Sequence, residues 1–261
     1  MLRPRIIPCL LLSNGALVKT ICFKSPKYIG DPLNAVRIFN DKQADELIFI
    51  DIEATALKKE PDYKLIRDLA RECRMPLCYG GGVKTADDVE RLINLGVEKV
   101  AVSSAAIRNP LLVKDAAKRV GSQSVVVVLD VRKNLLDKQG YEVYTHNGEI
   151  GTGMNPMLAA KMMEEQGAGE IVVNSIDRDG TQAGYDLEII ELVRNVVKIP
   201  LTALGGAGKI QHIADLFGKY GIIGAAAGSM FVFKGKYKAV LIQYLDQKDR
   251  NNLFRNGAAD C

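Results

Sequence analysis

Short runs of apolar, mostly β-branched residues alternate with longer amphipathic runs along the whole chain. The short runs are typical of buried strands, and the long ones of helices that cover a sheet. Strands are predicted over residues 5–11, 46–52, 76–80, 98–103, 124–130, 169–174, 200–204 and 222–227. Helices are predicted over residues 31–43, 61–73, 85–95, 109–118, 156–166, 186–197, 209–219 and 236–246. Strands that each precede a helix predict an α/β protein with the (β/α)8 fold, a TIM barrel.

A length of 261 residues fits two ordinary domains or one barrel of this kind. A doubly wound open sheet is the alternative, but it usually has fewer units at this length. No linker or low-complexity stretch divides the sequence, so we expect a single domain over residues 1–261. Residues 131–153 form the longest interruption, and the turn at Asn147-Gly148 predicts a hairpin inserted after the fifth strand.

The two halves of the sequence resemble each other. Residues 46–52 read Glu-Leu-Ile-Phe-Ile-Asp-Ile, and residues 170–176 read Glu-Ile-Val-Val-Asn-Ser-Ile. Self-similarity at a fixed spacing indicates a repeated structural unit. We therefore predict two half-barrels, over about residues 1–120 and 121–246.

Glycine-rich or serine-containing turns follow four of the predicted strands, at matching places in the two halves. These turns contain Gly81 and Gly82, Ser103 and Ser104, Gly205 and Gly206, and Gly228 and Ser229. Glycine lets backbone N–H groups approach an anion closely, and the loops after the seventh and eighth strands of such barrels often hold phosphate. The alternative is that each glycine serves only a tight turn. Because the set is doubled, we predict two sites for the phosphates of a small molecule.

Composition narrows the function classes. The chain is 48% hydrophobic and 25% charged, which excludes a disordered protein, and its net charge of +4 is too small to indicate a nucleic-acid partner. It has 5 cysteines without a Cys-x-x-Cys motif, and 2 histidines, which disfavours disulfides and metal sites. Apolar runs fall short of the ~18–20 residues that span a membrane. We expect a cytoplasmic protein with no metal, no cofactor and no membrane partner.

Longer motifs carry a family resemblance. Residues 5–10 read Arg-Ile-Ile-Pro-Cys-Leu, residues 175–181 read Ser-Ile-Asp-Arg-Asp-Gly-Thr, and residues 204–209 read Leu-Gly-Gly-Ala-Gly-Lys. With Tyr79-Gly-Gly-Gly, these resemble HisF, the cyclase subunit of imidazole glycerol phosphate synthase, over residues 3–245. The resemblance implies that a HisH-like glutaminase docks on the barrel bottom and releases ammonia, which crosses the barrel to a bisphosphate at the top.

The resemblance also implies roles for residues at the top of the barrel. Lys19, Asp179 and Gly180 match positions that bind the substrate. Two aspartates that end the first and fifth strands act as general acid and base, and Asp130 matches the second of them. The family's first strand reads Cys-Leu-Asp-Val-Lys-Asp-Gly, whereas residues 9–15 here read Cys-Leu-Leu-Leu-Ser-Asn-Gly.

Leu11 thus stands where the family has its first catalytic aspartate. Strand alternation gives Leu11 the same inward orientation as Arg5 and Cys9. Leucine cannot transfer a proton, and general acid–base catalysis typically contributes about 10²–10⁴-fold. We therefore predict impaired cyclase activity unless another carboxylate substitutes.

Four charged residues begin predicted strands at the other end of the barrel: Arg5, Glu46, Lys99 and Glu170. Barrel interiors are normally filled by branched apolar residues, so two cations and two anions there are unusual. The resemblance implies that they form the gate through which ammonia enters. The alternative is that charges at strand starts face solvent.

Other departures resemble a particular group of paralogues. Thr-Ile-Cys follows Lys19, and Val232 stands between two phenylalanines where the family has histidine. The resemblance is to HisF-like barrels of surface-polysaccharide and flagellar-glycan pathways, which supply ammonia to a separate sugar amidotransferase. Two alternatives stay open: a working cyclase subunit of histidine biosynthesis, and a non-catalytic module that binds a phosphorylated metabolite.

Overall fold

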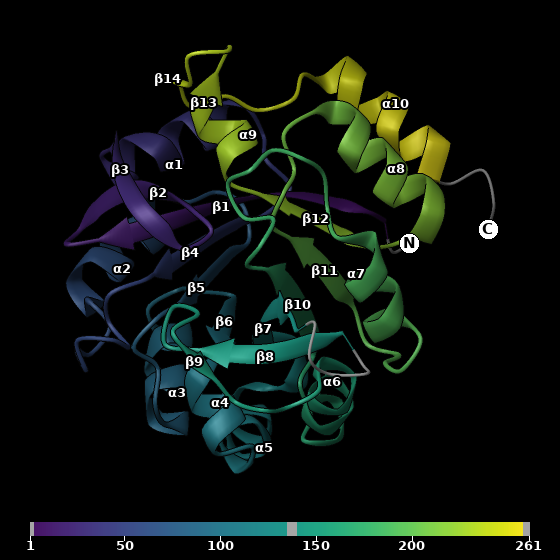
Figure 1. Ribbon diagram of the computed structural model, residues 1–261. Helices are drawn as coiled ribbons and strands as arrows, with labels where there is room; N and C mark the ends of the chain where they lie inside the picture. Colours follow the sequence, from purple (N-terminus) through teal and green to yellow (C-terminus); the bar gives the residue numbers. More distant parts are fainter. Residues whose placement is uncertain (1–2, 135–139, 258–261) are drawn as a thin grey trace.

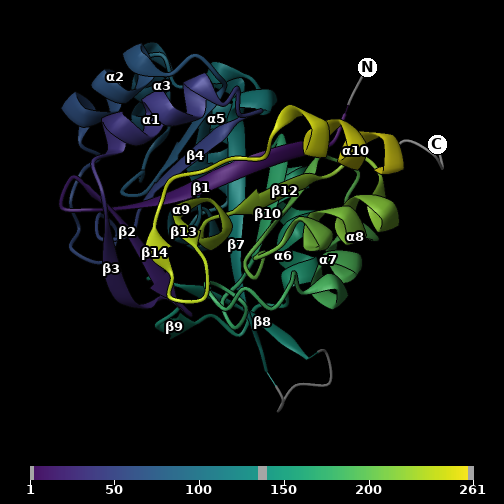
Figure 2. The same ribbon diagram turned by 90° about the horizontal axis from the view of Figure 1, so that it is seen from above.

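The computed structural model describes residues 3–134 and 140–257. Its centre is a closed barrel of parallel strands (Figures 1 and 2). The strands are β1 (Arg5–Ser13), β4 (Leu47–Asp51), β5 (Leu77–Gly80), β6 (Lys99–Val102), β7 (Val125–Lys133), β10 (Glu170–Ser175), β11 (Leu201–Leu204) and β12 (Gly224–Ala227). Each pairs with the next in this order, and β12 pairs with β1, which closes the barrel. The predicted (β/α)8 fold is confirmed.

Helices surround the strands in Figure 1 and cover the outer face of the barrel. They are α1 (Pro32–Asp41), α2 (Tyr63–Glu72), α3 (Ala86–Asn94), α5 (Leu111–Val120), α6 (Pro156–Glu165), α7 (Leu187–Arg194) and α8 (Ile210–Tyr220). Shorter helical segments are α4 (Ser104–Arg108), η1 (Ser122–Ser124) and α9 (Ser229–Val232). Capping residues fix where several helices begin. At α3, the side chain of Thr85 accepts from the backbone N–H of Asp88, and the side chain of Asp88 accepts from that of Thr85. The seven longer helices named above match predicted helices, whereas α4, η1 and α9 were not predicted and the last predicted helix is treated below.

Alternate residues of the strands point to the two sides of the barrel wall. Those that point outward pack under the helices in one large core. Those that point inward form a second, small apolar cluster of Ile7, Cys9, Ile48, Cys78, Ala101, Val126, Val128, Val172 and Ala226. Leu11 continues the inward row of β1 and lines a cavity at the carboxyl ends of the strands, which we call the mouth.

A hairpin extends β7 beyond the barrel. Strand β8 (Tyr141–Thr145) pairs antiparallel with β7, and β9 (Ile150–Gly151) pairs antiparallel with β8. The turn between them has positive φ angles of 52° at His146 and 57° at Asn147. This hairpin lies within the predicted insertion, of which residues 135–139 are outside the described residues.

A second hairpin follows β1, and the sequence analysis did not predict it. Strand β2 (Ala16–Ile21) pairs antiparallel with the end of β1, and β3 (Lys24–Gly30) pairs antiparallel with β2. We call these two strands the β2–β3 arm. The arm lies beside the mouth and positions Lys19 and Thr20 against the loop after β10.

The helix predicted over residues 236–246 is wrong. Strands β13 (Phe233–Lys234) and β14 (Ala239–Val240) form a short hairpin there, and Gly235 in its turn has a φ of 72°. The chain continues extended, and helix α10 (Gln247–Gly257) begins only afterwards. Tyr244 explains the difference, because its ring packs 5.3 Å from that of Phe231 and its hydroxyl donates to the carbonyl of Ile6. These tertiary contacts outweigh the helical periodicity of the segment.

The bottom of the barrel is fixed by contacts among the two ends of the chain and one loop. Asp45 accepts hydrogen bonds from Ile6 N at 3.0 Å, from Arg250 at 3.1 Å and from Arg3 at 3.2 Å. Figure 2 shows the start of β1 beside α10. Within residues 3–134 and 140–257, no helix is long and apolar enough to cross a membrane.

Candidate functional site

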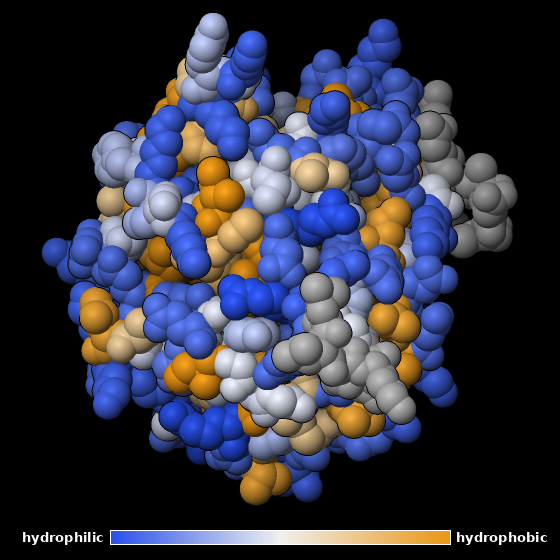
Figure 3. All heavy atoms as spheres, viewed as in Figure 1, coloured by the Kyte–Doolittle hydropathy of each residue, from blue (hydrophilic) through white to orange (hydrophobic). Residues whose placement is uncertain are grey.

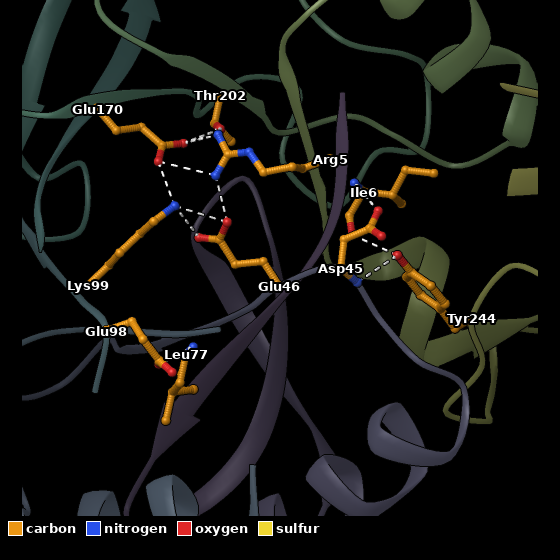
Figure 4. Close-up of polar contacts among 10 residues, drawn as sticks. All are labelled: Arg5, Ile6, Asp45, Glu46, Leu77, Glu98, Lys99, Glu170, Thr202 and Tyr244. Carbon is orange, nitrogen blue, oxygen red and sulfur yellow. Dashed lines mark hydrogen bonds and ion pairs between the residues drawn. The ribbon is translucent and has the colours of Figure 1, made fainter. Parts of the chain in front are cut away.

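Four charged side chains form a closed ring across the bottom of the barrel (Figure 4). Arg5 contacts Glu46 at 2.6 Å and Glu170 at 2.7 Å, and Lys99 contacts each of the same two carboxylates at 2.9 Å. Glu46 and Glu170 are only 3% and 4% exposed. The two carboxylates are buried and the two cations are partly buried, and the four charges face one another across the barrel. We call them the ring.

Mutual pairing keeps the ring charged despite its burial. Burial favours the neutral forms of Arg5, Lys99 and Glu170, but the opposite charges beside them outweigh it. They raise the pKa values of Arg5 and Lys99, and they lower the pKa of Glu170 to about 2. Thr202 adds a hydrogen bond of 2.6 Å to Glu170. Arg5, Lys99 and Glu170 thus stay ionised at physiological pH.

The barrel interior above the ring is apolar, apart from two free thiols, Cys9 and Cys78. Burial raises the pKa of Cys9 to about 12 and that of Cys78 well above its ordinary value. Both thiols are therefore protonated and behave as small hydrophobic groups. No general base is hydrogen-bonded to either, among the contacts of the described residues, so neither is a candidate nucleophile.

The mouth holds a cavity of about 430 Å³ that reaches down to Cys9 and Cys78. In Figure 3, hydrophobic residues lie at the base of a hollow on this face, with hydrophilic residues around it. Leu11, Ile50 and Leu204 supply apolar lining. The cavity joins the interior of the barrel to the surface.

Asp130, at the mouth end of β7, is the titratable group that best suits acid–base chemistry. Its carboxylate accepts a hydrogen bond of 2.9 Å from the amide of Asn174 and one of 3.4 Å from the hydroxyl of Ser103. Burial raises its pKa to about 7, although these two hydrogen bonds act in the opposite direction. A carboxyl group with this pKa can both donate and accept a proton at neutral pH.

No second carboxylate takes the place of the aspartate that Leu11 replaces. Asp51 accepts hydrogen bonds from the backbone of Glu53 and Ala54 and so closes its own turn. Asp179 is paired with Lys19. Asp177 lies on the same loop, exposed, and accepts from the backbone N–H of residue 133. Asp51 and Asp179 line the same cavity as Asp130 but are held by these other contacts, and the impaired cyclase activity stays a prediction.

The residues predicted to bind anions fall into two groups. Those that line the cavity are Lys19, Gly81, Gly82, Ser103, Ser104, Asp179 and Gly228. Those that are buried outside its lining are Gly180, Gly205, Gly206 and Ser229. The turns of the first half therefore line the cavity. Of the turns of the second half, one glycine, Gly228, lines it.

Close packing by itself requires glycine in both sets of turns. A Cβ atom at Gly81 would lie 2.4 Å from the carbonyl oxygen of Asp51, and one at Gly206 would lie 2.1 Å from that of Gly184. The φ angles are 112° and 103°, which side-chain-bearing residues rarely adopt. Glycine at these positions thus has a structural reason that does not depend on an anion.

Several residues of the mouth were missed by the sequence analysis. Lys58, Lys84 and Arg108 line the cavity on the first-half side, and Asn174 lines it beside Asp130. The internal repeat could have pointed to Asn174. It aligns Asn174 with Ile50, so a polar residue stands at an inward-facing strand end where the first half has an apolar one. No metal site adds to this set: the described residues contain no group of three or more His, Cys, Asp or Glu side chains that could hold an ion.

The fold and this site define a class: (β/α)8-barrel proteins with a titratable carboxyl group at the mouth and a buried charge ring at the bottom. Residues 5–238 match the family model described as histidine biosynthesis protein. The chain is 56% identical, over 97% of its length and 100% of the relative's, to a Leptospira borgpetersenii protein that carries the provisional name imidazole glycerol phosphate synthase subunit HisF. The chain belongs to this histidine biosynthesis family and, within it, to the HisF group.

Two other relatives show how the similarity is distributed. A Pseudomonas aeruginosa protein, provisionally named imidazole glycerol phosphate synthase subunit hisF2, is 50% identical over 94% of this chain and 97% of its own length. The Clostridium botulinum imidazole glycerol phosphate synthase subunit HisF is 42% identical over 90% of this chain and 92% of its own. The chain is thus more similar to the former than to the latter, as expected of a HisF-like paralogue.

Proposed function

We propose that this chain is the synthase-like subunit of a glutamine amidotransferase complex, without efficient cyclase activity. A HisH-like glutaminase docks on the barrel bottom, and its ammonia passes the ring and the apolar interior to the mouth. The ammonia then serves a separate acceptor, the amidation of a surface-glycan sugar by a sugar amidotransferase. The observation that carries the proposal is the apolar Leu11 at the mouth beside a complete ring at the bottom.

The lining of the interior supports the passage of a small neutral molecule. Between ring and mouth, the inward-facing side chains are apolar and mostly small, such as Ala101 and Ala226. The cavity reaches down to Cys78, whose pKa responds to the charges of Glu46 and Glu170 of the ring. An apolar path disfavours ammonium, because an unpaired ion in such surroundings has a large desolvation penalty.

The cyclase assay tests the loss of catalysis. The purified chain, supplied with ammonium salts and the family's bisphosphate substrate, is expected to form little imidazole product. Leu11→Asp restores a second proton carrier and should raise kcat by about 10²–10⁴-fold. Leu11→Asn is the matched control, because it is polar and of the same shape but cannot transfer a proton. Robust turnover by the unaltered chain would overturn the proposal.

Ring variants test the passage. Lys99→Ala opens the ring, so glutamine hydrolysis in the complex should continue while a larger share of the ammonia escapes before it reaches the acceptor. The measurement is free ammonia released per glutamine hydrolysed. The exposed Lys114→Ala on α5 is the control. Unchanged coupling in Lys99→Ala would argue for a purely structural ring.

A second candidate function is an active cyclase subunit of histidine biosynthesis. The observation that favours it is the pKa of about 7 at Asp130, which burial sets and which suits a single residue acting as both acid and base. Complementation of a cyclase-deficient histidine auxotroph would decide in its favour. Purification without any glutaminase partner would instead favour a non-catalytic module that binds a phosphorylated metabolite.

A further inference from the structure

The mouth is electrostatically asymmetric. On the first-half side, three cationic side chains line the cavity: Lys58, Lys84 and Arg108. None of them has an ion-pair partner among the described residues, and the ammonium group of Lys84 donates to the backbone carbonyl of Lys58 at 3.0 Å. Ser103 and Ser104 lie on the same side. These three unpaired cations outnumber the one carboxylate that lines this side, Asp51, and together with the hydroxyl donors they suit an anion.

On the second-half side, the positive charge is already neutralised. Lys19 is 5% exposed, and its ammonium group lies 2.8 and 2.9 Å from the two carboxylate oxygens of Asp179. Thr20 donates a third hydrogen bond, of 3.2 Å, to the same carboxylate. A further anion there would have to displace Asp179, which would leave a buried carboxylate unpaired.

The side chain of Lys19 also covers the second-half turns. A Cβ atom at Gly228 would lie 3.0 Å from Cε of Lys19, so the lysine stem is packed on this glycine. The β2–β3 arm holds it there: Cys22 N donates to the carbonyl of Asp179 at 2.9 Å, and the backbone of Thr20 packs against Gly180. Ser229, buried behind this contact, does not line the cavity.

One polar atom in the cavity wall is left for an uncharged part of a ligand. Asn174 is 7% exposed, and its Nδ2 group donates to Asp130. Its Oδ1 atom is buried without a hydrogen-bond partner in the described part of the chain. A buried acceptor without a donor is costly, which favours a ligand that brings an N–H or O–H group to it.

We propose that the mouth prefers a phosphomonoester, a ligand with one phosphate held on the first-half side and a neutral N–H or O–H donor that meets Asn174. A bisphosphate, by contrast, has to displace Asp179 from Lys19 to place its second phosphate. The proposal rests on the proposed function only in using the same cavity. It concerns which ligand binds, whereas Leu11 concerns proton transfer. Closure of the second-half side is therefore expected to raise the KM for a bisphosphate substrate, whereas Leu11 lowers the kcat of the cyclase reaction.

Isothermal titration with inorganic phosphate tests the number of anion sites. One phosphate per chain is expected, and Arg108→Ala should weaken its binding by about 10–150-fold, as the loss of one charged hydrogen bond would. Arg119→Ala, which removes an exposed cation already paired with Asp87, is the control and should leave binding unchanged. Two phosphates per chain in the unaltered protein, or no binding, would overturn the proposal.

Asp179→Asn tests whether the ion pair closes the second-half side. Freed of its partner, Lys19 becomes available to an anion, so the stoichiometry should rise from one phosphate to two. Asp177→Asn, on the same loop but exposed, should stay at one. If a folded Asp179→Asn protein still binds one phosphate, the closure is refuted. The wild-type stoichiometry decides the matter even if this variant does not fold.

Glycerol phosphate tests the donor. Asn174→Leu should lose about 3–10-fold more affinity for glycerol phosphate than for inorganic phosphate, because only the former brings a hydroxyl donor. An equal loss for both ligands would refute the role of Asn174. The phosphate titrations are carried out on this chain without a glutaminase. The share of ammonia that reaches the acceptor is measured without counting bound phosphates. Failure of this inference and failure of the proposed function are therefore told apart.

Discussion

The two ends of the barrel interior both hold buried charge, but they hold it differently. At the bottom, two cations alternate with two carboxylates, so each charged group has two opposite neighbours. At the mouth, Asp130 has only neutral hydrogen-bond donors. Pairing lowers the pKa of Glu170 to about 2, whereas burial raises that of Asp130 to about 7. Glu170 thus stays ionised at neutral pH, whereas Asp130 changes its protonation state there.

Under the proposed function, this difference in ionisation suits a passage at the bottom and a reaction site at the mouth. A ring that neither gains nor loses protons can orient and admit a small molecule without reacting with it. A carboxyl group that titrates near pH 7 can exchange protons with a ligand. Among the described residues that line the mouth, Asp130 has a pKa of about 7, whereas Leu11 presents an apolar side chain to the same cavity.

The largest expected effect comes from breaking the ring. Glu170→Ala leaves Arg5 and Lys99 with a single carboxylate, and removing one partner of a buried pair typically costs about 3–5 kcal/mol. Because the pKa of Glu170 is lowered to about 2, its contribution is fully present above about pH 4.5 and is lost as the pH falls toward 2. Urea denaturation at pH 7 and pH 3 measures both statements.

The matched control for that experiment is Glu191→Ala. Glu191 forms an exposed ion pair with Lys219 on the outer helices. Exposed pairs typically contribute about 0–1 kcal/mol, so this variant should unfold close to the unaltered chain. Equal losses in the two variants would show that the ring has no special energetic role.

A smaller effect is expected at the mouth, with the opposite pH dependence. The pKa of Asp130 is raised to about 7, so the folded state binds more protons than the unfolded state between about pH 4 and 7, and stability falls as the pH rises through that window. Asp130→Asn removes the fall and should be more stable than the unaltered chain by about 2–4 kcal/mol at pH 8, with little difference at pH 4. Parallel stability curves for the two proteins would contradict the raised pKa.

The smallest expected loss of stability concerns Tyr244, which contacts the bottom of the barrel outside the ring. Tyr244→Phe removes a hydroxyl that donates to the carbonyl of Ile6 at 2.8 Å and accepts from Asp45 N at 3.3 Å. A neutral hydrogen bond typically contributes about 0.5–1.5 kcal/mol, and the ring of Tyr244 stays packed against Phe231. Thermal unfolding should show a loss of about this size. A loss as large as that of Glu170→Ala would place the main support of the bottom outside the ring.

The sequence predicted the barrel well because strand and helix periodicities are local. Each barrel strand lies within a few residues of its predicted range, and the parity of β1 already placed Leu11 inward with Arg5 and Cys9. The last helix could not be predicted in this way. Residues 236–246 have helical periodicity, but Tyr244 packs against Phe39 and Phe231, which are distant in sequence, and holds the segment extended.

By itself, then, the sequence determined the fold class, the apolar residue at position 11 and the charges at the strand starts. Only the tertiary structure decided which polar groups pair with which. Lys19 and Asp179 meet because the β2–β3 arm docks on the loop after β10, and Asn174 meets Asp130 because β10 lies beside β7. Periodicity records which face a side chain takes, but not the partner it finds, because the partner comes from another strand that only the closed barrel brings near.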